Sequence, residues 1–541
     1  MSKGSFTTRR TFLASLAACL LLLGSAGTLS AKTIDFDDAS VAELEAAMAS
    51  GALTSERLVQ MCLARIKAYD AQGPKLRAVL TLNPKALETA RALDAERKAK
   101  GPRSLLHGVP VVLKDNYDTF DMPTTAGSLL LEGSQPSKDA FVAKKLRDAG
   151  AIILAKVNLS EFASGGAMSS LGGQSLNPHD LLRSPQGSSG GSAVAIAAGY
   201  APLGMGTDTG GSIRGPATST GVVALKTTHG LLSRSGIIPL ALSLDTAGPF
   251  ARNVSDIAAI LNVMTGDDPT DPSLKKNAGK VEKDYTKFLN PTALKGARIG
   301  LVKDFLGQDA EVDWVIEAAV AEMRKAGATV IEVHYPKWLL DARQGWYDAI
   351  RYPEFSAQVG DYLKTLGPKY PKSLAEMIER TTTLTSPRAD GAGPNPVRWT
   401  LFKRELESGT LTDYNYTSVR DHALPLVRDV LDGVMAANKL DALVYPTSSK
   451  RPVLLAAPPD PPGGGSSGVV ISNLSGFPDL IVPAGFTGDN LPVGISFVGT
   501  AFSEGKLIAL AYSFEQTTRA RRRPVHTPAL HDGKVSIPDP R

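Results

Sequence analysis

Two clusters rich in glycine and serine lie in the middle of the chain: GSSGGS at residues 187–192 and GTDTGGSIR at residues 206–214. Serine attacks an acyl carbon only where a base takes its proton and hydrogen-bond donors stabilise the developing oxyanion. Backbone N–H groups are good oxyanion donors, and glycine lets the backbone approach a ligand closely. Because residues 209–211 come directly before Ser212, the second cluster places several N–H groups beside one hydroxyl. An acyl-transfer site requires this local arrangement.

Other interpretations of the same clusters remain open at this point. A Gly/Ser stretch is often only a loop, and a phosphate loop needs the pattern G-x-x-x-x-G-K-[ST], which the chain lacks. Residues 187–191 also fit G-x-S-x-G, the nucleophile elbow centred on Ser189, but that motif needs a strand running directly into it. The preceding residues 183–186, RSPQ, do not predict a strand. A Ser-His-Asp site would also need a downstream histidine, and no candidate has an informative context: His229, His334, His422, His526 and His531.

On both sides of the clusters, short apolar runs alternate with amphipathic stretches. The apolar runs predict buried strands at 109–113, 151–157, 297–302, 328–333, 440–445, 480–484 and 492–498. Helical spacing predicts helices at 40–50, 54–70, 84–100, 138–149, 312–326 and 504–516. Alternating strands and helices with apolar strand cores are typical of α/β layers. We therefore expect one large α/β domain with N-terminal helices and a helix-rich, aromatic excursion near 336–435.

The first 31 residues have the layout of an export signal. Arg9 and Arg10 precede an apolar run from Phe12 to Leu23, and small residues follow it. The paired arginines resemble a twin-arginine signal, which predicts a periplasmic or secreted protein. About twelve apolar residues are too few to span a bilayer, so no stable membrane insertion is expected. A lipoprotein box ending at Cys19 is an open alternative.

Composition excludes several classes of protein. Hydrophobic residues make up 43% and charged residues 21%, which is ordinary for a globular chain and argues against extended disorder or a coiled coil. The net charge is +5, and it falls to +2 if residues 1–31 are removed, so a dedicated nucleic-acid binder is not expected. The two cysteines, Cys19 and Cys62, cannot build a zinc cluster or a disulfide framework. We expect Cys62 to be buried.

The residues from Gly187 to Arg214 resemble the amidase signature, and further motifs follow in the family's order. Residues 107–116, HGVPVVLKDN, are similar to the family's lysine segment. Later landmarks are similar as well: TAGP at 246–249, YPT at 445–447, GFP at 476–478 and PVG at 492–494. The resemblance covers nearly the whole mature chain. It implies an α/β/α layered amidase domain with a mixed central sheet over residues 32–523, followed by a C-terminal tail at 524–541.

The resemblance also implies a Ser-cisSer-Lys triad. In this chain Ser212 would be the nucleophile, Ser188 the bridging serine after a cis bond to Gly187, and Lys114 the base. Lysine is a base only when neutral, so it should be buried with a lowered pKa. The residues expected to form the oxyanion and substrate-binding site are Thr209, Gly210, Gly211 and Ser189. Two further residues are expected to be structural: Arg214, paired with a carboxylate such as Asp208, and His107.

The function implied is that of an exported serine amidase that needs no metal and no cofactor. The sequence as a whole resembles the bacterial peptide amidase subgroup most, whereas GGSIR at 210–214 is closer to the glutamyl-tRNA amidotransferase A subunit. The expected partner is a small-molecule or peptide amide, with the oligomeric state, monomer or homodimer, left open. An α/β-hydrolase-type esterase acting through Ser189 and a periplasmic binding protein are the alternatives. The segment 336–435 is expected to cover the acyl pocket and to set substrate preference.

Overall fold

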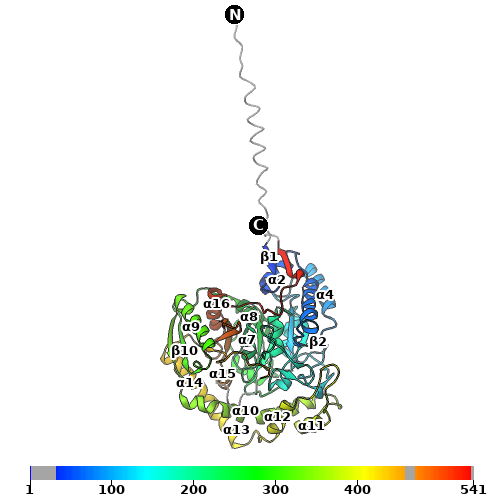
Figure 1. The fold of residues 1–541 in the computed structure, drawn as a ribbon, viewed down its shortest axis with the longest axis vertical. Coiled ribbons are helices and arrows are strands. Elements are labelled where there is room, and N and C mark those ends of the chain that lie inside the picture. The colour runs from blue at the N-terminus through cyan, green and yellow to red at the C-terminus, as the bar shows by residue number, and fades with distance from the viewer. Residues whose placement is uncertain (2–31, 457–468, 538–541) are drawn as a thin grey trace.

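The computed structural model describes Met1, residues 32–456 and residues 469–537. Within them, an eleven-stranded sheet has the order β11-β10-β12-β14-β13-β8-β9-β7-β3-β4-β2 (Figure 1). The strands are β2 (Val79–Leu82), β3 (Pro110–Lys114), β4 (Ile152–Val157), β7 (Leu203–Asp208), β8 (Val223–Lys226), β9 (Thr246–Ala251), β10 (Arg298–Val302), β11 (Thr329–Val333), β12 (Ala442–Pro446), β13 (Asp479–Phe486) and β14 (Pro492–Val498).

The sheet is mixed, as expected from the sequence. The runs β11-β10-β12 and β7-β3-β4 are parallel. All successive pairs along β12-β14-β13-β8-β9-β7 are antiparallel, and so is the pair β4-β2. Each position of β3, β4, β7, β9 and β14 is buried. Strands that are buried on both faces have continuous apolar sequences rather than alternating ones. Most of these strands were predicted from such apolar runs.

Helices pack against strands along the length of this sheet. α5 packs on β4, α6 on β3 and β7, α8 on β9, and α9 and α16 on β13. Their bounds are α2 (Val41–Ala49), α3 (Ser55–Ile66), α4 (Ala86–Lys100), α5 (Phe141–Asp148), α6 (Gly190–Ala197), α7 (Arg214–Thr220), α8 (Val254–Met264), α9 (Ala310–Lys325), α15 (Val469–Ser475) and α16 (Glu504–Thr518). The α/β layering predicted from the sequence is confirmed.

Three central strands, β7, β8 and β9, were not predicted from the sequence. The composition of β7 shows why such a strand is missed. β7 reads LGMGTD, so small and polar residues occupy a fully buried strand. A Cβ on Gly204 would lie 3.2 Å from side-chain atoms of Ile196 and Val112, and one on Gly206 would lie 2.6 Å from the ring of Phe250. These positions are glycine because side chains of the neighbouring strands β3 and β9 and of α6 come close to the backbone, and glycine gives no hydrophobic signal.

The expected helical excursion begins after β11. It comprises α10 (Lys337–Lys364), α11 (Leu374–Thr381), α12 (Pro396–Leu406), α13 (Tyr414–Ser418) and α14 (Leu424–Ala437). In Figure 1 helices α10 to α13 lie together at the lower edge of the molecule, opposite the chain termini. Phe355 of α10 and Phe402 of α12 both pack edge-on against Phe162, which anchors the excursion to the α/β core.

The two ends of the described chain meet. β1 (Lys32–Asp35) pairs antiparallel with β15 (Lys534–Ile537), and Arg65 donates a 2.9 Å hydrogen bond to the carbonyl of Thr527. The expected tail at 524–541 therefore packs on the domain as far as it is described. Apart from Met1, the expected signal at 1–31 lies outside the described residues. No described helix is both long and apolar enough to cross a membrane.

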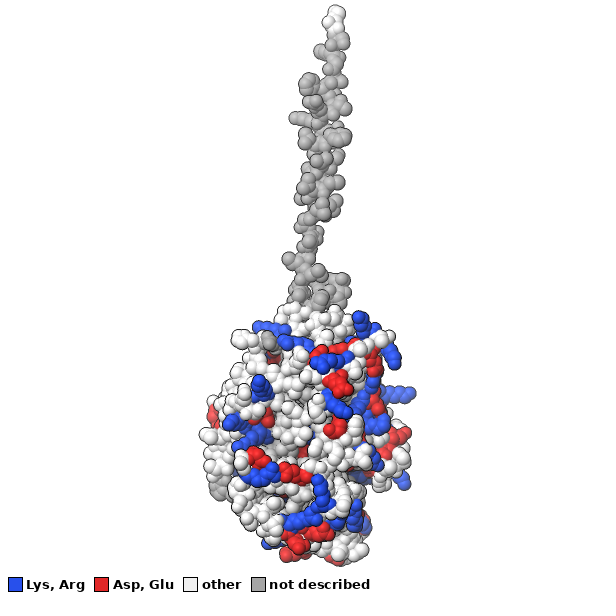
Figure 2. Space-filling model, turned by 90° about the vertical axis from the view of Figure 1, so that its right-hand side faces the viewer, with Lys and Arg blue, Asp and Glu red and all other residues white. Residues whose placement is uncertain are grey.

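Cations and anions are interspersed over the face of the molecule drawn in Figure 2. Cys62 is buried as predicted, and burial raises the pKa of its thiol to about 12. Its low thiolate content makes it a packing residue rather than a reactive one.

Candidate active site

Lys114 and Ser188 meet at the carboxyl end of the parallel strands β3 and β7. Lys114 is the last residue of β3, and its Nζ lies 2.7 Å from Ser188 Oγ. Two further contacts go to Thr207 of β7, at 2.8 Å to Oγ1 and 3.3 Å to the carbonyl oxygen. A neutral amine has two protons and one lone pair. If the two protons go to Thr207, the lone pair of Lys114 points at the Ser188 hydroxyl.

The surroundings of Lys114 favour the neutral amine. The side chain is fully buried, and this burial lowers the pKa of Lys114 to about 7, although Asp208 and Asp245 act in the opposite direction. The neutral form is therefore accessible near neutral pH. A group with a pKa close to the working pH is suited to general base catalysis.

The peptide bond between Gly187 and Ser188 is cis, as the family resemblance implied. The Ser188 carbonyl accepts a 3.0 Å hydrogen bond from the N–H of Ser160. A Cβ on Gly187 would lie 2.2 Å from Ser160 Oγ, so the loop beginning at Ser160 packs directly behind this peptide. Ser188 is thus held between β3 and that loop.

Ser212 lies in the turn between β7 and α7, next to the same serine cluster. Its carbonyl accepts a 3.0 Å hydrogen bond from the N–H of Ser189, and its side chain is half-buried. The Ser212 hydroxyl makes no hydrogen bond to another described residue. The structure therefore brings Lys114 and Ser188 into direct contact and places Ser212 beside them with its hydroxyl free.

A buried carboxylate shapes the turn that carries Ser212. Asp208 accepts hydrogen bonds from the N–H groups of Gly211 at 2.8 Å and Ile213 at 2.9 Å. Arg214 pairs with Asp208 at 3.0 Å and with Asp479 at 2.9 Å, and all three side chains are fully buried. Burial alone would raise the pKa of Asp208, but the Arg214 guanidinium holds it well below its usual range. The expected pairing of Arg214 with Asp208 is confirmed.

The same network redistributes the expected oxyanion donors. The N–H of Gly211 is engaged by Asp208 and is not available to a ligand. The N–H groups of Thr209, Gly210 and Ser212 donate to no other described residue, and the Thr209 hydroxyl donates to Asp245. Thr209, Gly210 and Ser212 therefore keep N–H groups that are free to meet an oxyanion. The loss of Gly211 follows from its contact with Asp208, which the sequence did not show.

Ser189 has a different environment from the one a nucleophile elbow requires. Its Oγ donates to the Thr207 carbonyl at 3.2 Å and accepts from the Thr207 N–H at 3.3 Å. No strand runs into it, because residues 184–187 are irregular. His107 is buried and hydrogen-bonded to the Leu93 carbonyl at 2.9 Å, as expected of a structural histidine.

Two residues that the sequence analysis did not single out border the turn before Ser212. A Cβ on Gly210 would lie 2.6 Å from Oη of Tyr347, which belongs to α10. A Cβ on Gly211 would lie 3.0 Å from Cγ2 of Val469, the first residue of α15. Neither side chain lies in a recognisable motif, so only the folded chain reveals them.

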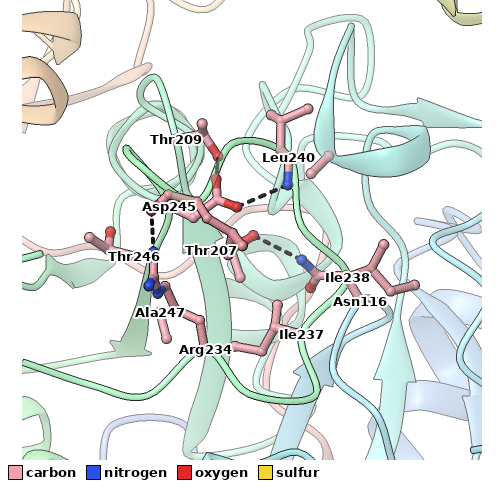
Figure 3. Close-up of a pocket in the computed structure, with 12 residues that line it drawn as sticks. Asn116, Thr207, Thr209, Arg234, Ile237, Ile238, Leu240, Asp245, Thr246 and Ala247 are labelled. Atoms are coloured by element: carbon pink, nitrogen blue, oxygen red, sulfur yellow. Dashed lines mark hydrogen bonds between the residues drawn. The ribbon is translucent and has the colours of Figure 1, made fainter. Parts of the chain in front are cut away.

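A cavity lies beside Thr207, which contacts Lys114 (Figure 3). Thr207 and Asn116 line it and are joined by a 3.1 Å hydrogen bond, and Thr209 and Asp245 lie across from them. Apolar residues such as Ile238, whose N–H donates to the Asn116 carbonyl, also line it. Ser212 does not line this cavity. Among the described residues, no cluster of histidine, cysteine or carboxylate side chains could hold a metal ion.

Comparisons with known proteins agree on one family. The family model named Amidase matches residues 57–508. The X-ray structure of peptide amidase from Stenotrophomonas maltophilia is 41% identical, has a TM-score of 0.82, and the match covers 91% of this chain and 99% of that one. The A subunit of glutamyl-tRNA(Gln) amidotransferase from a Cyanothece strain is 36% identical over 89% of this chain and 98% of its own length. A probable amidase of Arabidopsis thaliana is 33% identical over 94% of this chain and 95% of its own.

Proposed function

Because the chain belongs to the amidase signature family and is an amide-hydrolysing enzyme, we propose that it is an exported serine amidase that works through an acyl-enzyme on Ser212. The observation that carries this proposal is the 2.7 Å contact between Lys114 Nζ and Ser188 Oγ, at the buried end of β3 and beside Ser212. A buried lysine in contact with one serine, next to a second serine whose hydroxyl is free, is suited to moving a proton between them.

The first half of the reaction forms the acyl-enzyme. Neutral Lys114 takes the proton of Ser188 while Ser188 takes that of Ser212, and Ser212 Oγ bonds to the carbonyl carbon of the amide. The N–H groups of Gly210 and Ser212 stabilise the oxyanion. As the C–N bond breaks, the proton returns through Ser188 to the leaving nitrogen, which departs as ammonia or an amine.

The second half of the reaction releases the acid. Water gives a proton to the same relay and attacks the acyl carbon, the bond to Ser212 Oγ breaks, and Ser212 recovers its proton. The products are a carboxylate and ammonia or an amine, and the enzyme returns to its starting protonation state. Each step uses side chains of this chain alone.

The proposed substrates are small-molecule or peptide amides outside the cytoplasm. Similarity to peptide amidase at 41% identity supports this class. The export signal read from residues 1–31 and the mild net charge support it over a tRNA-linked substrate, even though relatives named for tRNA amidotransferases are similar over most of the chain.

A broad ammonia-release and acid-release screen tests the activity. The chain from residue 32 onward is assayed on amides, esters and carbamates, with Ser212→Ala as the inactive control. Turnover of amides alone supports the proposal. Turnover of esters alone would favour the esterase alternative, and tight amide binding without turnover would favour a binding protein.

Export is tested separately in bacterial cells. The full chain is expected in the periplasmic or secreted fraction, and replacing both Arg9 and Arg10 by lysine is expected to retain it in the cytoplasm. Equal distribution of the two forms would contradict the twin-arginine interpretation. A mature protein labelled by a lipid precursor would instead support the lipoprotein box at Cys19.

A further inference from the structure

The hydroxyl of Tyr347 lies beside the turn that carries the nucleophile. An added Cβ on Gly210 would lie 2.6 Å from Tyr347 Oη and 2.7 Å from Cζ, so the polar end of the side chain rests on this glycine. Gly210 is two residues before Ser212. A substrate whose carbonyl carbon is bonded to Ser212 Oγ would therefore extend past this phenol or past Val469, which borders Gly211.

This phenol is an available hydrogen-bond donor. Tyr347 Oη makes no hydrogen bond to another described residue, although the side chain is half-buried. Burial raises the pKa of Tyr347. The charge of Arg351 acts in the opposite direction and nearby carboxylates such as Asp245 add to the rise, so the hydroxyl keeps its proton throughout the working range of pH. Polar groups in such positions are normally satisfied by water or by a ligand.

The position of Tyr347 is fixed by its own helix. Arg351, one turn further along α10, forms a 2.6 Å ion pair with Glu405 of α12. It also donates a hydrogen bond to Ser164, in the loop that begins at Ser160 behind the Gly187–Ser188 peptide. α10 thus contacts both the turn at Gly210 and the loop that packs behind Ser188, which holds Tyr347 in place beside the site.

Other aromatic residues of α10 face elsewhere. The ring of Tyr352 lies under the guanidinium groups of Arg351 and Arg404, at 4.6 and 4.7 Å. Trp346 packs edge-on against Trp338, with ring centroids 6.1 Å apart. Among these aromatic side chains, only Tyr347 is placed to meet a substrate on Ser212.

We propose that the Tyr347 hydroxyl donates a hydrogen bond to an acceptor oxygen in the acyl part of the substrate, away from the scissile carbonyl. The enzyme would then prefer amides whose acyl group carries a second carbonyl, as in acylated amino acid amides, over plain alkyl amides. The inference rests on the proposed acyl-enzyme on Ser212. In that mechanism the scissile oxygen faces the N–H groups of Gly210 and Ser212, which leaves the phenol for the rest of the acyl group.

The test compares Tyr347→Phe with Tyr352→Phe on two amides of similar shape. N-acetylglycinamide has the second carbonyl, and 4-methylpentanamide has a branched carbon in its place. Loss of one neutral hydrogen bond is expected to lower kcat/KM for N-acetylglycinamide by about 3- to 10-fold in Tyr347→Phe. The value for 4-methylpentanamide should change less than about 2-fold, and Tyr352→Phe should leave the ratio between the two substrates unchanged.

Each other outcome overturns the inference. Equal losses on both amides in Tyr347→Phe would place the hydroxyl on the scissile carbonyl, and no loss on either would remove it from the site. The same comparison can be made without turnover. Calorimetry measures the affinity of both amides for Ser212→Ala and for the double variant Ser212→Ala/Tyr347→Phe. If the unsubstituted enzyme released ammonia from no amide, the proposed function would fail, whereas an active enzyme with an unchanged ratio would fail only the Tyr347 assignment.

Discussion

Lys114 Nζ and Ser188 Oγ are 2.7 Å apart, although 74 residues separate them in the chain. Lys114 ends β3, and Ser188 lies just before α6, which packs on β3 and β7. The N–H of Ser160, in the loop after β4, holds the Ser188 carbonyl. Functional groups in α/β sheets commonly gather at the carboxyl ends of parallel strands. The contact therefore depends on how α6 and the loop after β4 pack against the end of β3.

The first prediction concerns the nucleophile. Ser212→Ala should lower kcat by about 10⁴-fold or more, because the acyl-enzyme can no longer form. Ser189→Ala should keep most of the activity, since the Ser189 hydroxyl is occupied by the backbone of Thr207. Kinetics of both variants are measured on the same amide. A fluorophosphonate adduct mapped by mass spectrometry to Ser189 rather than Ser212 would reverse the assignment.

The second prediction concerns pH. Only neutral Lys114 can accept a proton, and burial lowers its pKa to about 7, so kcat/KM should rise with pH through about 7 and then level off. The rate rises rather than falls with pH because the protonated lysine cannot act as a base. Lys114→Ala should remove both the rate and this rise. A profile that falls across the same interval would exclude a neutral lysine base.

Part of this site could be predicted from the sequence, because its motifs are local. The motifs around Lys114, Ser188 and Ser212 can each be recognised from a short segment of sequence. The apolar run before Lys114 also predicts the strand that ends there. The pairing of Arg214 with Asp208 was also predictable, since six residues separate them.

The rest depends on long-range packing that no local pattern encodes. Asp479 and Asn473 reach Arg214 across about 260 residues of sequence, and Tyr347 lies in a helix without a motif. Gly211 looked like an oxyanion donor because glycine allows close approach, but a carboxylate three residues earlier binds its N–H. Whether a backbone N–H is bound by a neighbouring side chain or is free for a ligand can be seen only in the folded chain.

The third prediction concerns the buried ion pairs of Arg214. Arg214→Met leaves Asp208 and Asp479 without their shared cation, and breaking a buried pair in this way typically costs about 3–5 kcal/mol. The free energy of unfolding, measured by denaturant titration, should fall by about that amount, and activity should fall with it because Asp208 shapes the Ser212 turn. Arg420→Met removes an exposed pair with Asp421 and should cost less than about 1 kcal/mol. Equal costs would argue against the buried network.

The fourth prediction concerns the space between α10 and the turn. Gly210→Ala would place a Cβ 2.6 Å from Tyr347 Oη, so either α10 or the turn must move, and kcat/KM should fall by about 10²-fold. Gly345→Ala is a matched control on α10, where a Cβ has nothing within 4 Å. It should leave activity unchanged and stabilise the helix by about 0.5–1 kcal/mol. If Gly210→Ala behaved like the control, Tyr347 would not border the site.

The last prediction concerns the coupling between Lys114 and Ser188. If the two form one relay, either alanine substitution stops proton transfer from Ser212, and each should lower kcat by orders of magnitude. The double variant Lys114→Ala/Ser188→Ala should then be little worse than the more damaged single variant, because groups that act as a unit have strongly non-additive effects. Single-turnover rates of all four forms are measured with circular dichroism as a check of folding. Losses that multiply would mean that the two residues act independently. Tolerance of Lys114→Ala together with inactivity of a His229→Ala variant would instead assign the base to a histidine.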